Sequence, residues 1–253
     1  MNEHPALEAV ADEAVLVETT AQAPESANAA FERHFAAPER NPFFGWNPPP
    51  QPIRHHILSE VVLDGRFRGL FKSGRFIPGT GPRPPDQPPA ADAARPATTA
   101  ADGTAIIGCN PGHAQPFHWL TQSLPAIDVA MRREGQDRRT VLVLPPLTPW
   151  QEETLRILGY VETRRIPIDQ PDAHYAFARA EFSEYLAGQA VFRLSRHARD
   201  IYARLRDSVP VSLSEGRRLY LAGGGPIDNE AALIEALQQR GFEIVTQSGL
   251  SLT

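Results

Sequence analysis

The sequence predicts an α/β protein built on a doubly wound, mostly parallel sheet. From residue 104 onward, short apolar runs that suit buried strands alternate with amphipathic segments that suit helices. Glycine or proline stands at several of the junctions between these segments, as expected for turns and helix ends. Before residue 104 the pattern differs, and there we expect a disordered tail and a small β unit.

Composition narrows the class of protein. The chain has 253 residues, and its 25 prolines are too many for a compact α/β domain, so part of it should be irregular. The net charge of −5 argues against a nucleic-acid partner, because phosphate binding needs a basic surface. Cys109 is the only cysteine, which excludes an intramolecular disulfide and a cysteine zinc site. No apolar run is long enough to cross a bilayer, so we expect a cytoplasmic protein.

Three segments are expected before the α/β part. Residues 1–50 are acidic and then proline-rich, and we expect a mobile tail whose Phe43, Phe44 and Trp46 either dock on the domain or bind a partner. Residues 51–80 suit a small β unit with turns at Asp64-Gly65 and Ser73-Gly74. Residues 81–103 form a proline-rich linker.

Residues 104–216 form the predicted α/β lobe. A helix over 117–134 carries Phe117, Leu120, Leu124 and Ile127 on one face and should be kinked or broken near Pro125. Tyr175 and Phe177 belong to a segment, 169–187, that we interpret as a loop or short helix. The remaining predicted elements are strands at 104–109, 140–144 and 161–168 and helices at 150–158, with Thr148 as cap and Gly159 as stop, and 195–209.

Residues 217–253 are expected to begin a second Rossmann-like lobe. A strand ending at Ala222 leads to Gly223-Gly224-Gly225, a helix over 229–240 capped by Asp228 or Asn229, and a strand from Phe242. The glycines lie where a phosphate-binding loop would, but their spacing fits no nucleotide fingerprint, so a flexible turn is the other interpretation. Because a βαβ unit normally continues, this lobe is expected to be incomplete at Thr253.

His118 is the strongest candidate for chemistry. It lies where a strand passes into a helix, and ligands of open α/β sheets bind at the carboxyl ends of strands. The alternative is a structural histidine that is partly buried and bonded to the backbone. His55 and His56 are adjacent on a strand and point to opposite faces, so we expect no metal site there. The arginines of 195–209 either meet an anion or form a solvated face.

Two motifs resemble those of family 61 glycosyltransferases. The run Phe117-His118-Trp119-Leu120 through Leu124-Pro125 is similar to the family's (Y/F)HW-L-x-x-x-LP signature. About a hundred residues later, Leu219-Tyr220-Leu221, Asn229-Glu230, Gly241-Phe242 and Leu250-Ser251 are similar in order and spacing to its lYlSR…NE…GFe…lS block. The resemblance covers residues 104–253.

The resemblance implies a two-lobed GT-B architecture and a function. Such enzymes transfer a sugar from a nucleotide-sugar donor to a glycan or lipid-linked acceptor, and their fold requires no metal or other cofactor. The resemblance places His118 in the cleft, where a general base is the natural role for a histidine. It also places Asn229 and Glu230 beside the donor site, with Gly223 and Gly224 as the candidate phosphate loop. Peripheral association with a membrane stays open.

Two departures from the family pattern support an alternative. Ala222-Gly223 replaces the family's Ser-Arg, and the arginine before the Asn-Glu pair is missing, although arginine suits donor phosphates. The family's G-x-HGAGLTN block does not occur before Thr253. The alternative is therefore a non-catalytic module that binds a glycan or partner. A third hypothesis is an unrelated α/β enzyme whose triple glycine holds a nucleotide phosphate.

Overall fold

The chain folds into two compact units, Met1–Ala203 and Arg204–Thr253, and each is considered by itself. The structure is a computed structural model that describes residues 7–20, 52–66, 68–81, 99–134, 139–187, 195–208, 218–222 and 229–246. The aromatic segment at 43–46, most of the expected linker and Gly223–Gly225 lie outside these residues. The domain boundaries predicted from the sequence therefore stay predictions.

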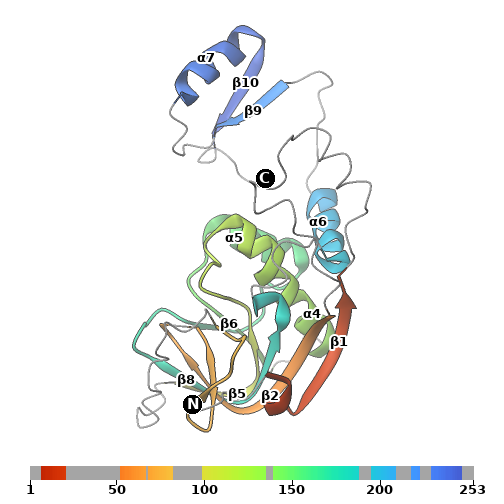
Figure 1. Cartoon of the computed structure of the whole chain (residues 1–253), viewed down its shortest axis with the longest axis vertical. Helices are drawn as coiled ribbons and strands as arrows, with labels where there is room; N and C mark the ends of the chain where they lie inside the picture. The colour runs from red at the N-terminus through yellow and green to blue at the C-terminus, as the bar shows by residue number, and fades with distance from the viewer. Residues whose placement is uncertain are drawn as a thin grey trace, which may run out of the picture. The chain divides into compact units, whose positions relative to one another are not determined.

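The first unit is built on an eight-stranded mixed sheet (Figure 1). Its strands follow the order β4-β3-β2-β8-β5-β6-β7, and β1 pairs with β2 beside this path. The α/β class is thus confirmed. The expected β unit at 51–80 is not a separate sheet, because β2 pairs directly with β8 along most of its length.

One half of the sheet is parallel. It contains β8, β5, β6 and β7, of which β6 is buried at all five positions. The strand expected at 161–168 is shorter, because Thr163 N–H donates to the Tyr160 carbonyl in a turn that precedes it. The bounds are β5 (Thr99–Ile107), β6 (Thr140–Leu144), β7 (Arg165–Pro167) and β8 (His174–Ser183).

The interpretation of 169–187 as a loop or short helix was wrong for residues 174–183, whereas residues 184–187 do form a short 3₁₀ helix, η3 (Glu184–Ala187). Residues 174–183 form β8, which lies between β2 and β5 in the middle of the sheet. The strand begins with alternating burial at Tyr175 and Phe177, but its second half is buried at four successive positions that include Glu181. A charged residue in a buried strand removes the apolar alternation by which strands are recognised.

The other half of the sheet is antiparallel. Asp64 ends β2, and the chain returns at Leu70 through a connection that Arg68 N–H closes on the Asp64 carbonyl. The expected turn at Ser73-Gly74 is confirmed, since both residues have positive φ, +50° and +73°. The bounds are β1 (Glu13–Thr19), β2 (Pro52–Asp64), β3 (Leu70–Lys72) and β4 (Arg75–Phe76).

The expectation of a mobile tail was wrong for residues 7–20. They form a short helix, α1 (Leu7–Val10), and the edge strand β1. Their acidic side chains find cations on the domain: Glu8 pairs with Arg54 at 2.8 Å and Glu13 with Arg133 at 2.5 Å. Strand pairing with β2 orders a segment that its composition alone would leave in solvent.

The predicted helix of 117–134 is one continuous helix with a π segment in its middle. It comprises α3 (Pro116–His118), the π-helix η2 (Trp119–Ser123) and α4 (Leu124–Glu134). Leu124 N–H donates to the Trp119 carbonyl, five residues back. Pro125 has no N–H to offer an α-helical acceptor, so the widened turn accommodates it. The helix is therefore not broken near Pro125, and its irregular turn ends just before the proline.

The π turn also changes which side chains are buried. Leu124 and Ile127 are completely buried, as expected. Phe117 was expected beside them, but it is 48% exposed, and Trp119 occupies the core instead. A π turn shifts the helical phase, so residues before it leave the face defined by residues after it. The expectation for Phe117 was therefore wrong.

The next helix brings its first turn close to the π segment. α5 (Pro149–Leu158) begins after Thr148, whose N–H donates to Gln151 Oε1 at 2.8 Å, and it ends at Gly159 with φ +87°. Both predicted boundaries are confirmed. Trp119 Nε1 donates to Thr154 Oγ1 at 2.9 Å and joins α5 to η2. α6 (Arg196–Ser208) buries Ala198 and Ile201, as predicted.

The second unit is a βαβ arrangement. β9 (Arg218–Ala222) and β10 (Phe242–Thr246) are parallel, and α7 (Glu230–Gln239) connects them. Gly241 has a φ of +79°, which confirms it as the residue that stops the helix. Asn229 stands at the N-cap position, as one of the two predicted residues, but its side chain makes no capping hydrogen bond.

Candidate functional site

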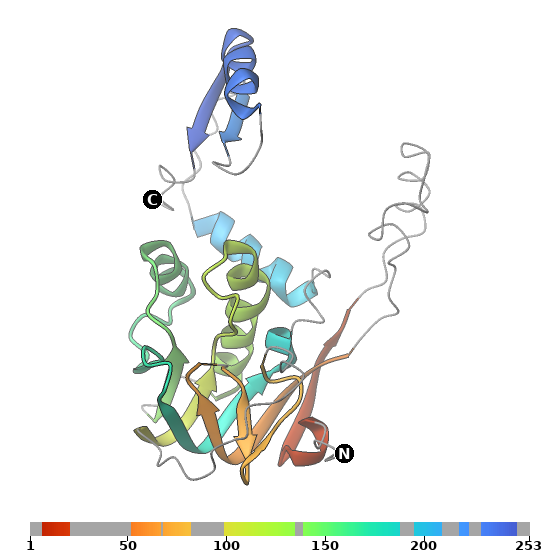
Figure 2. The same ribbon diagram turned by 60° about the vertical axis from the view of Figure 1, so that its left-hand side comes forward.

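The candidate site lies where the strand order of the parallel half reverses. The chain passes from β5 to β6 on one side, whereas β8 lies on the other side of β5. In open α/β sheets, ligands bind outside the carboxyl ends of the strands at such a point. The segments that follow β5 and β8 meet there, since Asn110 Nδ2 donates to the Leu186 carbonyl at 3.5 Å. Figure 2 shows the parallel strands with the helices that follow them.

His118 belongs to this place. It ends α3 and is partly buried, and its Nδ1 lies 2.9 Å from Gln122 Oε1. Gln122 Oε1 also accepts a hydrogen bond from Asn110 Nδ2, and Asn110 Oδ1 accepts one from Gly112 N–H at 3.0 Å. The predicted catalytic residue is thus connected through two buried amides to the turn that follows β5.

Two neighbours hold the imidazole ring from its sides. A Cβ atom on Gly112 would lie 2.8 Å from His118 Cγ and Cδ2, so only glycine lets the turn pack against the ring. The Phe117 ring meets the imidazole edge to face, with centroids 5.6 Å apart. The exposed face of Phe117 and the accessible side of His118 therefore form one surface, which suits an apolar ring face with hydroxyl groups beside it.

Arg68 brings a positive charge to the same turn. Its guanidinium donates to the Asn110 carbonyl at 3.2 Å and to His113 Nδ1. Its backbone φ of +53° is unusual for a residue with a side chain and is found where surrounding contacts impose it. Among the described residues it pairs with no carboxylate. A partly buried guanidinium of this kind can bind an anionic group of a ligand.

His113 is held neutral beside that charge. Burial, and after it the Arg68 guanidinium, lower the pKa of His113 from 6.5 to about 4. His113 is only 8% exposed, and its carbonyl accepts a hydrogen bond from Gln151 Nε2 at 2.8 Å. The turn after β5 is thus tied to both β2–β3 and α5, and it stays uncharged at His113 around neutral pH.

We predict that His113 makes the protein sensitive to acid. Because its pKa is depressed in the folded state, the unfolded chain binds the proton first, and stability falls as pH drops from 6.5 toward 4. After a discount for screening we expect a loss of about 2 kcal/mol from this group. Urea unfolding of the wild type and His113→Asn across this range measures it, because asparagine keeps an acceptor for Arg68 but does not titrate. Equal slopes in the two proteins would contradict the assignment.

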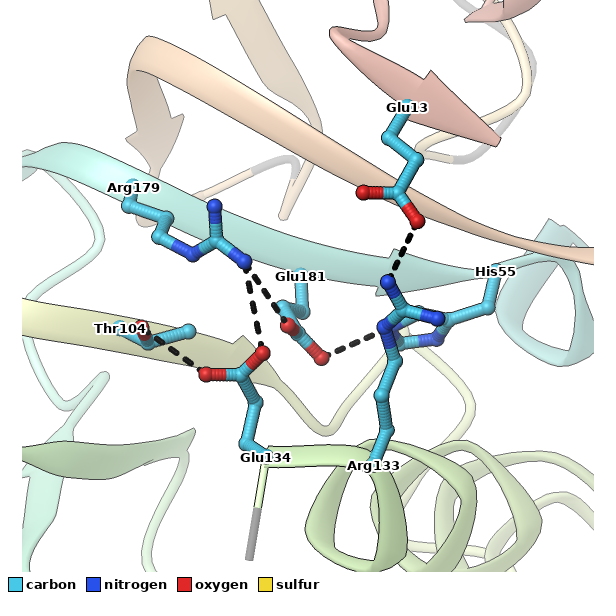
Figure 3. A network of polar contacts seen from close by, with 7 residues as sticks. All are labelled: Glu13, His55, Thr104, Arg133, Glu134, Arg179 and Glu181. Carbon is cyan, nitrogen blue, oxygen red and sulfur yellow. Dashed lines mark hydrogen bonds and ion pairs between the residues drawn. The ribbon is translucent and has the colours of Figure 1, made fainter. Parts of the chain in front are cut away.

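A second polar cluster lies between α4 and the sheet (Figure 3). Arg179 approaches the carboxyl groups of Glu134 and Glu181 at 3.4 and 3.8 Å. A hydrogen bond between the two carboxyl groups contributes to the pKa values of both. His55 Nε2 lies 2.7 Å from Glu181 Oε2. Burial raises the pKa of Glu181, and the hydrogen bond from Glu181 lowers that of Glu134, so Glu181 is the proton donor of the pair.

This cluster is a structural element. Glu181 is completely buried and His55 is 1% exposed, so no ligand reaches the centre of the network. Two further contacts hold the C-terminus of α4: Glu134 accepts a hydrogen bond from Thr104 on β5, and Arg133 pairs with Glu13 on β1. The cluster holds α4, and with it the preceding π segment, against the sheet.

The expectation that His55 and His56 face opposite ways is confirmed. His56 Nε2 meets Glu184 Oε1 at 3.0 Å, away from the Glu181 partner of His55. Over the residues that the structure describes, no group of three or more His, Cys, Asp or Glu side chains is placed to hold a metal ion.

The remaining predicted site residues belong to the second unit. Asn229 is exposed, and Glu230 begins α7, with Tyr220 OH 3.5 Å from its carboxylate. Gly223 and Gly224 lie outside the described residues. Their proposed contact with a donor phosphate stays a prediction.

Sequence reasoning missed several residues of the site. Asn110 and Gln122 stood inside the motif region, and the four-residue spacing of His118 and Gln122 on a helix is a signal that could have paired them. Arg68 and His113 carried no such signal, because Arg68 arrives from the β2–β3 connection, 45 residues earlier in the chain.

Comparisons with known proteins leave the family open. No family model, curated protein or solved structure matches the chain. Among the described residues, no helix is both long and apolar enough to cross a membrane. The class that the fold defines is an α/β protein with a polar, histidine-containing site at the reversal point of a mixed sheet.

Proposed function

We propose that the chain acts as a glycosyltransferase of the family 61 type, which transfers a sugar from a nucleotide-sugar donor to a hydroxyl of a glycan or lipid-linked acceptor. The observation that carries the proposal is the place of His118. It lies at the carboxyl end of β5, beside the reversal point, within the motif that resembles the family's signature. The finer assignment to a GT-B architecture, with unit 1 as the acceptor lobe, is part of the proposal.

The proposed chemistry assigns one role to each group. His118 accepts the proton of the acceptor hydroxyl while the oxygen forms its bond to the anomeric carbon of the donor. The bond from that carbon to the nucleoside diphosphate breaks, and the leaving group takes the electron pair. Phe117 offers an exposed ring for the apolar face of the acceptor sugar, and Arg68 offers a cation to an anionic part of either substrate.

A specific observation favours the second candidate, a non-catalytic module that binds a glycan. Phe117 is 48% exposed beside His118, and such a surface binds a sugar without any chemistry. Ala222 stands where the family carries a serine followed by a phosphate-binding arginine, which weakens the case for donor binding.

A transfer assay separates the two. The full chain is incubated with a panel of radiolabelled nucleotide sugars and with saccharide and lipid-linked acceptors, and both transfer and donor hydrolysis are measured. We expect transfer from at least one donor. Saccharide binding without nucleotide binding or turnover would support the binding module. If the chain shows no saccharide binding, no nucleotide binding and no turnover, both the glycosyltransferase and the binding module are contradicted.

A further inference from the structure

We propose that Asn110 and Gln122 are positioning residues that determine which nitrogen of His118 accepts a proton. In this inference they keep the hydrogen of the neutral imidazole on Nδ1 and leave Nε2 as the basic atom. Its catalytic meaning rests on the proposed function, whereas the hydrogen-bond assignment rests on the geometry alone.

The orientation of Asn110 is set by the backbone. Gly112 N–H lies 3.0 Å from one terminal atom of the Asn110 side chain, and an N–H can only donate. That atom is therefore the amide oxygen. The other terminal atom is the nitrogen, and it faces two acceptors, the Leu186 carbonyl and Gln122. Since Asn110 is only 8% exposed, water cannot take over either bond.

The orientation of Gln122 follows from that of Asn110. The Asn110 nitrogen is a donor, so the Gln122 atom that faces it must be the oxygen. The reversed amide would set two donors against each other in a place that is 1% exposed. Gln122 Nε2 has no partner among the described residues, so no other contact opposes this orientation.

The tautomer of His118 is the last link. Its Nδ1 lies 2.9 Å from the same Gln122 oxygen, which accepts but cannot donate. Nδ1 therefore carries the hydrogen, and in the neutral ring the lone pair is on Nε2. Gly112 and Phe117 bound the ring on two sides, so the imidazole keeps the orientation in which this bond forms.

The order of the chain explains how the parts meet. Asn110 follows β5 directly, whereas His118 and Gln122 are four residues apart on the helix that begins after the turn. Residues with this spacing lie on one helical face. The backbone of the β5 turn is thereby connected to a side chain that faces the site, which is the arrangement by which buried neighbours fix a catalytic histidine.

Two substitutions with the same added charge test the assignment. In Asn110→Asp, a carboxylate replaces the amide donor, so Gln122 turns its nitrogen toward it and donates to His118 Nδ1. The hydrogen of His118 then moves to Nε2. In Gln122→Glu, the carboxylate still accepts from both Asn110 and His118, so the hydrogen stays on Nδ1. A role that is only structural would not distinguish the two variants.

The measurement is a long-range ¹H–¹⁵N correlation spectrum of the labelled full chain at about pH 8.5, well above the ordinary histidine pKa. We expect Nδ1–H in the wild type and Gln122→Glu and Nε2–H in Asn110→Asp. Transfer by Asn110→Asp should fall at least about 10-fold in kcat with little change in KM.

The outcomes separate this inference from the proposed function. An Nε2–H tautomer in the wild type, or the same tautomer in the two charged variants, overturns it. The wild-type spectrum alone tests the tautomer of His118, even if Asn110→Asp does not fold. If the tautomers are as expected but no nucleotide sugar is turned over, the proposed function fails and the positioning roles stand.

Discussion

Under the proposed function, replacing His118 with glutamine should lower the rate of sugar transfer by about 10²- to 10⁴-fold, the range in which a general base contributes. Glutamine has a similar size and can still donate to Gln122 Oε1, so the turn after β5 should keep its structure. It cannot accept a proton from an acceptor hydroxyl at neutral pH. The loss should therefore appear in kcat, with KM changed only a few-fold.

The control for this prediction is another histidine of the same unit. His174 begins β8 and meets Asp64 at 3.2 Å, at the opposite end of the strand from the site. His174→Gln should transfer sugar at the wild-type rate. If His118→Gln transfers sugar at the wild-type rate, His118 is not the general base, even though the chain is a transferase.

The largest effect on stability is expected from Glu181→Ala, which should lower the free energy of unfolding by about 3 kcal/mol. The substitution leaves a cavity beneath α4 and removes the acceptor of His55 and the proton donor of Glu134. Glu181→Gln should cost less than about 1 kcal/mol, because its amide can donate to Glu134 and accept from His55.

The pH dependence gives this pair a second signature. The pKa of Glu181 is raised in the folded state, so its favourable contribution is present at low pH and is lost as pH rises through that pKa. Wild-type stability should therefore fall relative to Glu181→Gln as pH rises above 4.5, the ordinary glutamic acid value. Urea unfolding measures both effects. Glu162→Ala, which removes an exposed carboxylate in the turn after α5, should change neither the stability nor its pH dependence. Equal losses in the alanine and glutamine variants of Glu181 would contradict the assigned network.

Local sequence signals predicted the elements whose determinants are local. The boundaries of α5 follow from Thr148 and Gly159, and Pro125 marked the helix of 117–134 as irregular, although the π segment itself was not predicted. The position of His118 in the first turn of a helix that follows a strand also came from local pattern. These features need only a few neighbouring residues, so one sequence is enough to find them.

The features that were missed depend on contacts between distant parts of the chain. β8 can carry a buried Glu181 because His55 and Glu134, which belong to other elements, are its hydrogen-bond partners. No pattern within 169–187 predicts those partners. β1 is ordered by its pairing with β2, 33 residues or more further along, which its acidic composition hides. Arg68 reaches the site through a backbone conformation that follows from the fold around it.

The most direct test of the site is a titration of the full chain, labelled with ¹⁵N in its histidines, with saccharides and nucleotide sugars. We expect the ring resonances of His118 to shift saturably with at least one saccharide, while those of His55, buried beneath α4, stay in place. If no saccharide or nucleotide sugar moves the His118 resonances of the folded protein, the turn after β5 is not the ligand site and the proposed function fails with it.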